Sequence, residues 1–382
     1  MRFTDCIDIT GESCKTFDGN KKYISTGAVD VDHIVQSQIE LVSYDSKPSR
    51  ANLMTDDKSI LFAKMQGTKK ILLINEDLKE NVYSTGFFSV APKNNILNKE
   101  CLYHLLGSKA FLNQKDKYCS GATQKAITLD GLNKIEINIP KLEEQNQIAK
   151  RLDVIKRILD SNDLALKKYD DLIKARFTEL FGTVKDNPYH FPTATLKEVC
   201  HKITDGKHGG CEQEADSGYD YVGAREIYDG VIHYDTAPQI TYADFAKDYR
   251  RCNIEQGDMV IVNTGATIGK SAIASSPLTE RTLLQKSVAL IKVKTDVISA
   301  KFLRFCYMAN PSMYLVESAS AQPNLLLSKM NATAIYLPPI ELQEQFVAFV
   351  EQTDKSKLAV QQSLEKTQLL FDSLMQEYFG EN

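Results

Sequence analysis

The sequence predicts an α+β protein with two mixed α/β globular domains in a pseudo-twofold arrangement, separated by two long helices that form an antiparallel coiled coil. Three observations predict this fold class. The chain repeats itself 198 residues later, each repeat ends in a long stretch of helical periodicity, and short β-branched runs precede both stretches. With 382 residues, 43% of them hydrophobic, the chain can bury two ordinary cores.

The repeat is clearest where residues 139–182 align without gaps with residues 337–380. Solenoid repeats have periods of about 20–50 residues, so a repeat of this length indicates a duplicated domain. Residues that match across the repeat include Pro140 and Pro338, Gln145 and Gln343, Gln147 and Gln345, Leu132 and Met330, and Ile137 and Ile335. The predicted divisions are two globular domains and the helix that follows each, over residues 1–138, 139–182, 183–336 and 337–382.

Each globular domain is predicted to contain short buried strands separated by turns. A helical stretch follows the strands in both domains, at residues 101–114 and 299–309. Between these landmarks the two copies differ almost everywhere, including in loop length. A shared scaffold with divergent loops suggests that the two copies bind different things. The expected strands lie at residues 60–62, 71–74 and 87–90 in the first domain and at 221–222, 259–262 and 288–291 in the second.

The two terminal stretches show a repeat of about 3.5 residues, which makes a narrow apolar seam that needs a partner helix. Each helix begins after a proline and ends at Gly182 or Gly380, where glycine can adopt the left-handed cap. About 38 residues at 1.5 Å each give a helix of roughly 57 Å. The predicted seam residues are Ile148, Leu152, Ile155, Leu159, Asn162 and Leu166 in the first helix, and Val350, Val360, Leu364, Phe371 and Leu374 in the second.

An alternative is that each helix packs only on its own globular domain. Asn162, Thr353 and Lys357 argue against this alternative, because they occupy stripe positions where a globular core would favour Leu. A single Asn in such a seam can fix the register of two helices, or it can be a tolerated residue at the solvent edge.

Composition indicates a soluble protein of a reducing, cytoplasmic compartment, with no membrane segment. Its eight cysteines include no C-x-x-C pair, and neither a signal peptide nor a long apolar run is present. The net charge of −4 excludes a polycation that coats nucleic acid indiscriminately, so any surface that binds nucleic acid must be local.

The sequence offers no complete catalytic or metal-binding pattern. Residues 264–271 nearly match a phosphate-binding P-loop, but Thr264 stands at the first glycine position and a short, proline-stopped segment follows. A nucleotide-dependent enzyme that uses this segment is the alternative function. No two glycines have the G-x-G spacing of a methyl-donor site, and no G-x-S-x-G elbow is present. Cys200, His201, His208 and Cys211 match no common zinc spacing, so no metal site is predicted.

Polar and basic residues near the expected strands are the candidates for contacts with DNA. Gln and Asn can make paired hydrogen bonds to adenine, while Lys, Thr and backbone N–H groups can hold phosphates. The alternative for any single Lys is that it is ordinary solvated surface. The candidates are Lys64, Gln66, Lys69, Lys70, Gln124 and Lys125 in the first domain, and Thr204, Lys207, His208, Thr264, Thr267, Lys270, Gln285, Lys286, Gln322 and Asn324 in the second.

Several short segments follow one another in order along the chain: residues 84–92 (STGFFSVAP) and 137–145 (INIPKLEEQ) in the first copy, and residues 203–206 (ITDG), 257–262 (GDMVIV), 264–270 (TGATIGK), 322–325 (QPNL) and 335–345 (IYLPPIELQEQ) in the second. Taken in order, these segments resemble the DNA-specificity subunit of type I restriction-modification enzymes, over nearly the whole chain. The first copy departs from the pattern most, because residues 64–70 (KMQGTKK) replace the glycine loop.

The resemblance implies two target-recognition domains, each reading one half of a split site in double-stranded DNA. It also implies that the two helices dock two modification subunits, which carry S-adenosylmethionine and the methyltransferase activity, and that restriction and translocase subunits join the assembly. The chain itself would be non-catalytic and would hold no cofactor. A scaffold whose recognition domains no longer bind DNA is a third possibility.

Overall fold

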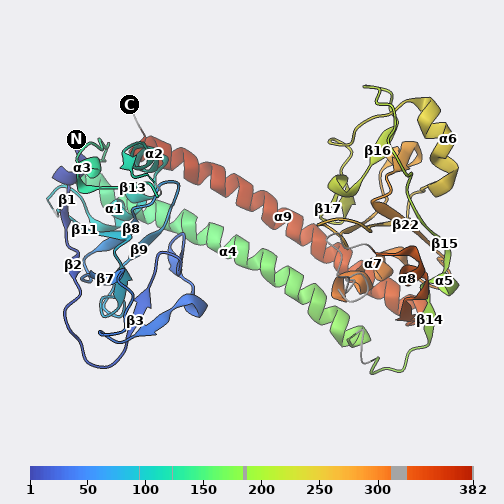
Figure 1. Cartoon of the computed structure of the whole chain (residues 1–382), viewed down its shortest axis with the longest axis horizontal. Helices are drawn as coiled ribbons and strands as arrows, with labels where there is room; N and C mark the ends of the chain where they lie inside the picture. Colours follow the sequence, from blue (N-terminus) through green and yellow to red (C-terminus); the bar gives the residue numbers. More distant parts are fainter. Residues whose placement is uncertain (94, 123, 184–186, 311–324, 381–382) are drawn as a thin grey trace. The chain divides into compact units, whose positions relative to one another are not determined.

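The computed structural model describes residues 1–93, 95–122, 124–183, 187–310 and 325–380. These residues form two compact units. Unit 1 contains Met1–Ala165 and Val360–Asn382, and unit 2 contains Leu166–Ala359. Each unit combines a globular part of mixed strands and helices with segments of both long helices, which confirms the α+β fold class (Figure 1).

Unit 1 is built on two larger sheets. One is a four-stranded antiparallel sheet in the order β1-β11-β8-β9, and the other is a five-stranded sheet in the order β2-β7-β10-β3-β6. Helix α1 packs against β11, β8 and β9. The elements are β1 (Ile7–Ile9), β2 (Glu12–Ser13), β3 (Lys21–Ile24), β4 (Val29–Asp30), β5 (His33–Ile34), β6 (Glu40–Val42), β7 (Ala51–Met54), β8 (Ile60–Ala63), β9 (Ile71–Leu73), β10 (Val82–Ser84), β11 (Phe87–Pro92), α1 (Lys99–Leu106), α2 (Lys109–Lys117), β12 (Cys119–Ser120), β13 (Ala126–Ile127) and α3 (Leu129–Leu132).

Unit 2 repeats the four-stranded antiparallel sheet, in the order β15-β22-β19-β20. Its first and last strands, β14 and β23, pair with each other just before the second long helix begins. The elements are β14 (Thr193–Thr195), α5 (Leu196–Val199), β15 (Cys200–Asp205), β16 (Asp220–Val222), β17 (Ile227–Tyr228), β18 (Val231–Ile232), α6 (Tyr242–Cys252), β19 (Met259–Val262), β20 (Ser271–Ile273), β21 (Thr282–Leu284), β22 (Val288–Val293), α7 (Ala300–Ala309), α8 (Leu327–Ala332) and β23 (Ala334–Tyr336).

Both faces of the four-stranded sheet are buried. In β19, Met259 and Ile261 pack into the core that receives the long helices, whereas Val260 and Val262 pack into a second core on the other face. Because successive side chains of a strand point to opposite faces, two cores require a strand that is apolar throughout. This explains why residues 259–262 read as a continuous apolar run.

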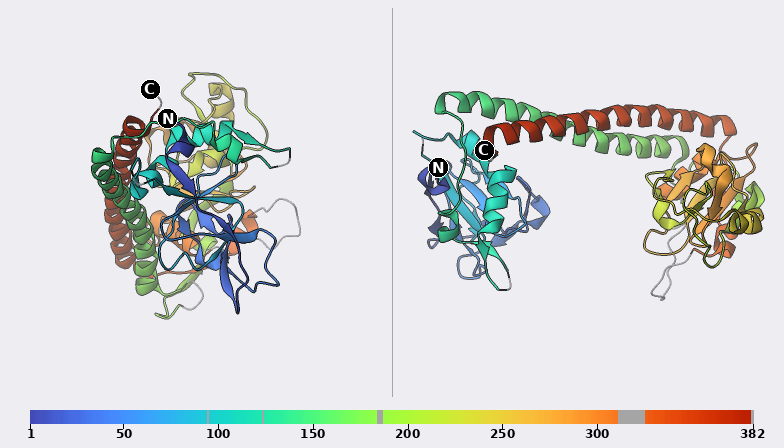
Figure 2. Two further views of the ribbon diagram at one scale, coloured as in Figure 1. Left: turned by 90° about the vertical axis from the view of Figure 1, so that its left-hand side faces the viewer. Right: turned by 90° about the horizontal axis from the view of Figure 1, so that it is seen from above.

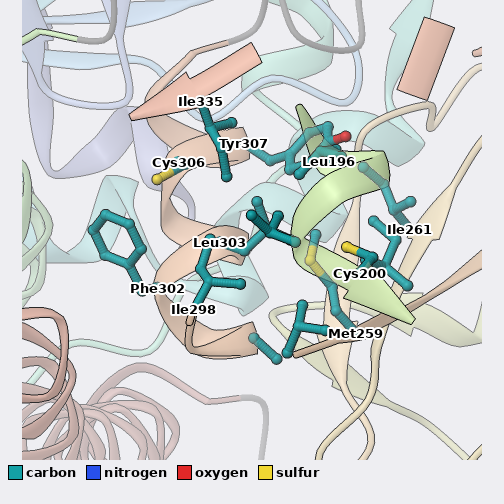
Figure 3. Packing of buried hydrophobic residues seen from close by; sticks show 14 of the residues in the cluster. Leu196, Cys200, Met259, Ile261, Ile298, Phe302, Leu303, Cys306, Tyr307 and Ile335 are labelled. Carbon is teal, nitrogen blue, oxygen red and sulfur yellow. The ribbon is translucent and has the colours of Figure 1, made fainter. Parts of the chain in front are cut away.

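The core of unit 2 that receives the helices is shown in Figure 3. Tyr307 of α7 lies toward Leu196, whereas Phe302 lies on the other side of α7, where its ring contacts Phe181 of the first long helix (ring centroids 4.8 Å apart). All of these side chains are buried. Burial raises the pKa of the Cys200 thiol to about 12, so this cysteine is a neutral core residue. None of the eight cysteines forms a disulfide.

Two 40-residue helices, α4 (Leu142–Phe181) and α9 (Ile340–Phe379), contribute one segment each to both units, and within each unit their segments run side by side in opposite directions (Figure 2). In unit 1, Asn162 Nδ2 donates to Ser363 Oγ (3.3 Å) and Arg151 to Tyr378 Oη (3.4 Å), so the numbering rises along one helix as it falls along the other. In unit 2 the Lys357 ammonium lies 2.6 Å from Asp170. Polar contacts therefore connect the two helices along their middle turns.

The ends of the helices pack into the globular cores. Ile148, Leu152, Met375 and Phe379 belong to the core of unit 1. Their equivalents Phe346, Val350, Phe177 and Phe181 belong to the core of unit 2. The helices thus pair with each other and also pack on the globular parts, so features of both interpretations of the helical stretches are present. All of the predicted seam residues are buried or half-buried.

The elements that recur in both units support a duplicated architecture. The precise domain boundaries remain a prediction. The observed helices start at Leu142 and Ile340, three residues inside the predicted divisions. Among the described residues, no helix combines the length and apolar character needed to cross a membrane.

Candidate nucleic-acid interface

In unit 2, three separate segments meet at one end of the four-stranded sheet. Antiparallel pairing of Asp205 with Ala289 and of Val262 with Val288 places the end of β15, the start of β22 and the end of β19 at this edge. Backbone hydrogen bonds extend the contact beyond the strands: Lys207 N donates to Leu284 O (2.7 Å) and Asn263 N to Ser287 O (3.0 Å). The edge thereby collects the predicted residues Thr204, Lys207, His208, Thr264, Thr267, Lys270, Gln285 and Lys286.

The segment that resembles a P-loop is a β-hairpin. It joins β19 to the antiparallel strand β20, with Val262 N donating to Lys270 O (2.8 Å) and Gly269 N to Val262 O (2.9 Å). Gly265 and Gly269 adopt positive φ values of 100° and 90°, which the turn requires. A nucleotide-binding P-loop needs a helix whose N-terminus faces the phosphates, and here a strand follows instead. The hairpin therefore argues against the nucleotide-dependent alternative.

The turn after β15 is held by ion pairs. The Lys207 ammonium lies 2.7 Å from Asp248 and 3.5 Å from Asp244, and only 10% of its side chain is exposed. The hydrogen bond to Asp248 raises the pKa of Lys207, and burial acts in the opposite direction. His208 Nε2 lies 2.7 Å from Asp205. Lys207 thus fixes the turn in this structure, whereas the exposed residues Lys270 and Lys286 carry positive charge to solvent.

Unit 1 places its β8–β9 hairpin at the equivalent edge of its sheet. Residues 64–70 form this turn, closed by the hydrogen bond from Ala63 N to Lys70 O (2.9 Å). A second hairpin, β12–β13, lies against it, because Gln66 N donates to Lys125 O (3.0 Å). Lys64, Gln66, Gln124 and Lys125 are consequently brought together by two hairpins that are about 60 residues apart in the sequence.

The same backbone hydrogen bond occurs at this point in both units. Ile127 N donates to Lys64 O (2.9 Å) in unit 1, and Leu325 N donates to Asn263 O (2.7 Å) in unit 2. Ile127 and Leu325 are equivalent in the repeat, and Lys64 and Asn263 each follow the equivalent strand directly. The two sheet edges therefore share one plan although their loop sequences differ. The predicted residues Gln322 and Asn324 lie outside the described residues.

The side chains of Lys69 and Lys70 have other neighbours than the side chain of Gln66. The Lys70 ammonium donates to Thr26 O (2.8 Å), toward the segment between β3 and β4. Lys69 lines a small recess together with Lys109 of α2 and Asp372 of α9. Burial lowers the pKa of Lys69. Lys64 lies 4.3 Å from the centre of the Phe88 ring, and burial lowers its pKa as well. The structure therefore does not gather Lys69 and Lys70 with Lys64 and Gln66.

Sequence reasoning missed the residues that hold these turns in place. Lys115 is 1% exposed, and its ammonium donates to Met65 O (2.8 Å) and Thr68 O (3.0 Å). Asp116 accepts a hydrogen bond from Gly67 N (3.0 Å). In unit 2 an added Cβ at Gly206 would collide with the carbonyl oxygens of Leu284 and Gln285, so only glycine fits. The Thr-Asp-Gly sequence at residues 204–206 was the one available signal.

The described part of the chain contains no cluster of three or more His, Cys, Asp or Glu side chains arranged to hold a metal ion. Cys200 is buried in the core, and His208 is engaged with Asp205. The two sheet edges offer amide, ammonium and hydroxyl groups on short hairpins, a combination suited to hydrogen bonding with base edges and phosphates.

Comparison with protein families gives two matches within the chain. The model described as "Type I restriction modification DNA specificity domain" matches residues 7–168 and again residues 189–369. Each match covers a globular part and most of the long helix that follows it.

Curated relatives carry the same description. The chain is 23% identical over 316 residues to the type I restriction enzyme EcoBI specificity subunit of Escherichia coli, covering 74% of this chain and 65% of the relative. It is 29% identical over 168 residues to the HindI specificity subunit of Haemophilus influenzae, covering 41% of this chain and 35% of the relative. The matched regions thus span less than two thirds of these two relatives.

Two solved structures share the fold. A chain from a study of complex assembly and conformational transition of the type I R-M system superposes with a TM-score of 0.62 at 20% identity, over 99% of this chain and 96% of that chain. The S subunit of a type I restriction-modification system from M. genitalium superposes with a TM-score of 0.59 at 16% identity, over 100% of this chain and 96% of that chain.

Proposed function

Because the chain belongs to the type I restriction modification DNA specificity family, we propose that it reads DNA sequence for a type I restriction-modification system. Each of its two recognition domains reads one half of a split site in double-stranded DNA. The observation that carries this proposal is the repeated sheet edge, where the turn that follows the equivalent strand, β8 or β19, presents different polar side chains in each unit. A constant frame with different loops suits two readers of different half-sites.

The chain itself is proposed to be non-catalytic. Its recognition edges present Lys, Gln and Thr side chains on hairpins, groups suited to hydrogen bonds with bases and phosphates. Methyl transfer is assigned to two modification subunits that bind S-adenosylmethionine, and restriction and translocase subunits complete the assembly. This chain would need no cofactor of its own.

The long helices supply a surface for the modification subunits. Val154 and Ile158 of α4 are 47% and 43% exposed, and Leu369 of α9 is 71% exposed. Val154 and Ile158 lie four residues apart and are neighbours on the helix surface, and contiguous exposed apolar surface marks sites where a further protein binds. Docking on the helices would also leave the hairpins free for DNA.

Reconstitution with the modification subunits tests the proposal. Purified chain, modification subunits alone and the complex are each incubated with S-adenosylmethionine and genomic DNA, and methylated positions are mapped by sequencing. We expect methylation only by the complex, at a bipartite sequence. Methyl transfer by the chain alone, or methylation at a single continuous half-site, would contradict the proposal.

A further inference from the structure

A fully buried glutamine fastens the start of α4 to its globular domain. Gln145, in the first turn of the helix, is 0% exposed. Its Oε1 accepts a hydrogen bond from Asn98 N (2.9 Å), and its Nε2 donates to Ile96 O (2.8 Å) and Pro140 O (3.0 Å). One side chain therefore connects the helix, the segment that leads into it and the loop before α1.

The same three hydrogen bonds recur in unit 2. Gln343, in the first turn of α9, is also 0% exposed. Its Oε1 accepts from Ser299 N (2.9 Å), and its Nε2 donates to Pro338 O (2.9 Å) and Val297 O (3.2 Å). Asn98 and Ser299, which donate to the two glutamines, are the N-cap residues of α1 and α7. The arrangement is thus repeated atom for atom between domains whose loops differ.

These hydrogen bonds fix the direction of the helix relative to its domain, which the surrounding apolar contacts alone do not. Burial of apolar surface is non-directional, so Ile148 or Phe346 alone would allow a helix to tilt on its domain. Three hydrogen bonds from one planar amide fix direction as well as distance. A buried amide that lost them would leave unsatisfied polar groups, which opposes any other orientation of the helix.

We propose that Gln145 and Gln343 are positioning residues that set the angle between each recognition domain and its long helix, and thereby the number of base pairs tolerated between the two half-sites. The inference rests on the proposed function. A helix of 40 residues is about 60 Å long, so a tilt of about 3° at its start moves its other end by about 3 Å, close to the 3.4 Å rise of one base pair.

The test compares Gln145→Leu and Gln343→Leu with the matched changes Gln147→Leu and Gln345→Leu. Gln147 and Gln345 lie two residues further along the same helices and are exposed. Each full-length variant is assembled with the modification subunits, and methylation is measured on sites whose half-sites are separated by the native spacer or by one base pair more or less. We expect the preference for the native spacer to fall about tenfold, which corresponds to about 1.4 kcal/mol, in the first pair only.

Several results would overturn the inference. One is an unchanged spacer preference in folded Gln145→Leu and Gln343→Leu complexes; another is the same loss in the Gln147 and Gln345 controls. A loss of half-site sequence preference without a change in spacer preference would also contradict it. Should the leucine variants fail to fold, Gln343→Glu supplies the answer, because a carboxylate still accepts from Ser299 N–H but cannot donate to Val297 O and Pro338 O.

A measurement without DNA separates this inference from the proposed function. Hydrogen exchange of the Asn98 and Ser299 amides reports directly on the two glutamine contacts. We expect slow exchange in the wild type and at least about tenfold faster exchange in the matching leucine variant. If exchange behaves in this way but the wild-type complex methylates no bipartite site, the proposed function fails and the fastening role stands. Equal exchange in wild type and variant removes the fastening role itself.

Discussion

The ammonium group of Lys115 is surrounded by the backbone of the 64–70 turn instead of by water. It donates to Met65 O and Thr68 O and lies 3.0 Å from the Asp116 carboxylate. A buried charge is tolerated only when it is paired and hydrogen-bonded, and here these contacts also shape the turn that presents Gln66. Lys115 therefore links the stability of unit 1 to the geometry of its recognition edge.

Replacing Lys115 by Met should lower the free energy of unfolding of unit 1 by about 3–5 kcal/mol, because two carbonyls and a carboxylate lose their buried partner. Urea unfolding followed by circular dichroism measures the effect. Lys117→Met, a change to an exposed lysine of the same helix, should remain within about 0.5 kcal/mol of the wild type. Equal effects of the two substitutions would show that Lys115 does not hold the turn.

The acid sensitivity of unit 1 should depend on His104. This residue is 3% exposed, and burial lowers its pKa even though Asp153 lies 2.8 Å from Nε2 and acts to raise it. The unfolded state therefore binds a proton first, near the ordinary histidine pKa of about 6.5. The stabilising contribution of neutral His104 is present above that pH and is lost as the pH falls through its lower folded pKa.

Replacement of His104 by Gln should consequently reduce the dependence of unfolding free energy on pH below about 6.5. Urea unfolding at a series of pH values from 5 to 8 gives the slope for both proteins. A slope in the variant equal to that of the wild type would place the acid-sensitive group elsewhere.

The β19–β20 hairpin and the β8–β9 hairpin are the elements that distinguish the two halves most clearly. They leave equivalent strands and meet equivalent partners, but one turn is rich in glycine and threonine and the other in lysine. In unit 2 the turn holds Lys270 exposed, whereas the charge of Lys207 is satisfied by Asp244 and Asp248. The hairpin is therefore the part of this edge expected to face a phosphate.

Lys270→Ala should weaken DNA binding by the complex and reduce the slope of log affinity against log salt concentration by about 0.9, the value for one lost phosphate contact. Titration of a labelled site at several salt concentrations measures both quantities. Lys197→Ala serves as the control, since this exposed lysine lies in α5, before the start of β15 and thus at the other end of that strand. An unchanged salt slope in the Lys270 variant would exclude the phosphate contact.

For the whole chain, the repeat implies that the two readers are independent. Substituting residues 1–138 by the corresponding part of another family member should change one half-site and leave the other intact, because the second sheet edge belongs to unit 2. Sequencing of methylated sites before and after the exchange tests this prediction. A change in both half-sites would refute the modular view.

Much of this organisation was predictable from sequence because it depends on periodicity. The 3.5-residue pattern predicted both long helices to within a few residues, and the apolar runs at residues 60–62 and 259–262 marked the central strands. The hydrogen bonds from Lys115 to the 64–70 turn and the ion pairs of Lys207 were not predictable, because the partners are distant in sequence and lie on other elements. For the same reason, the sequence does not show that the side chains of Lys69 and Lys70 diverge from that of Gln66.

The two-faced sheet limits how a recognition surface can be transplanted. Leu61 and Ala63 of β8 pack with Ile24 and Val29 on one face, while Ile60 and Phe62 of the same strand pack toward the helices. If only surface loops were grafted, the new segments would lie against strand side chains that pack with different residues in this protein. The smallest interchangeable piece is therefore the sheet together with everything that covers it, and engineered specificity should be sought by exchanging that piece intact.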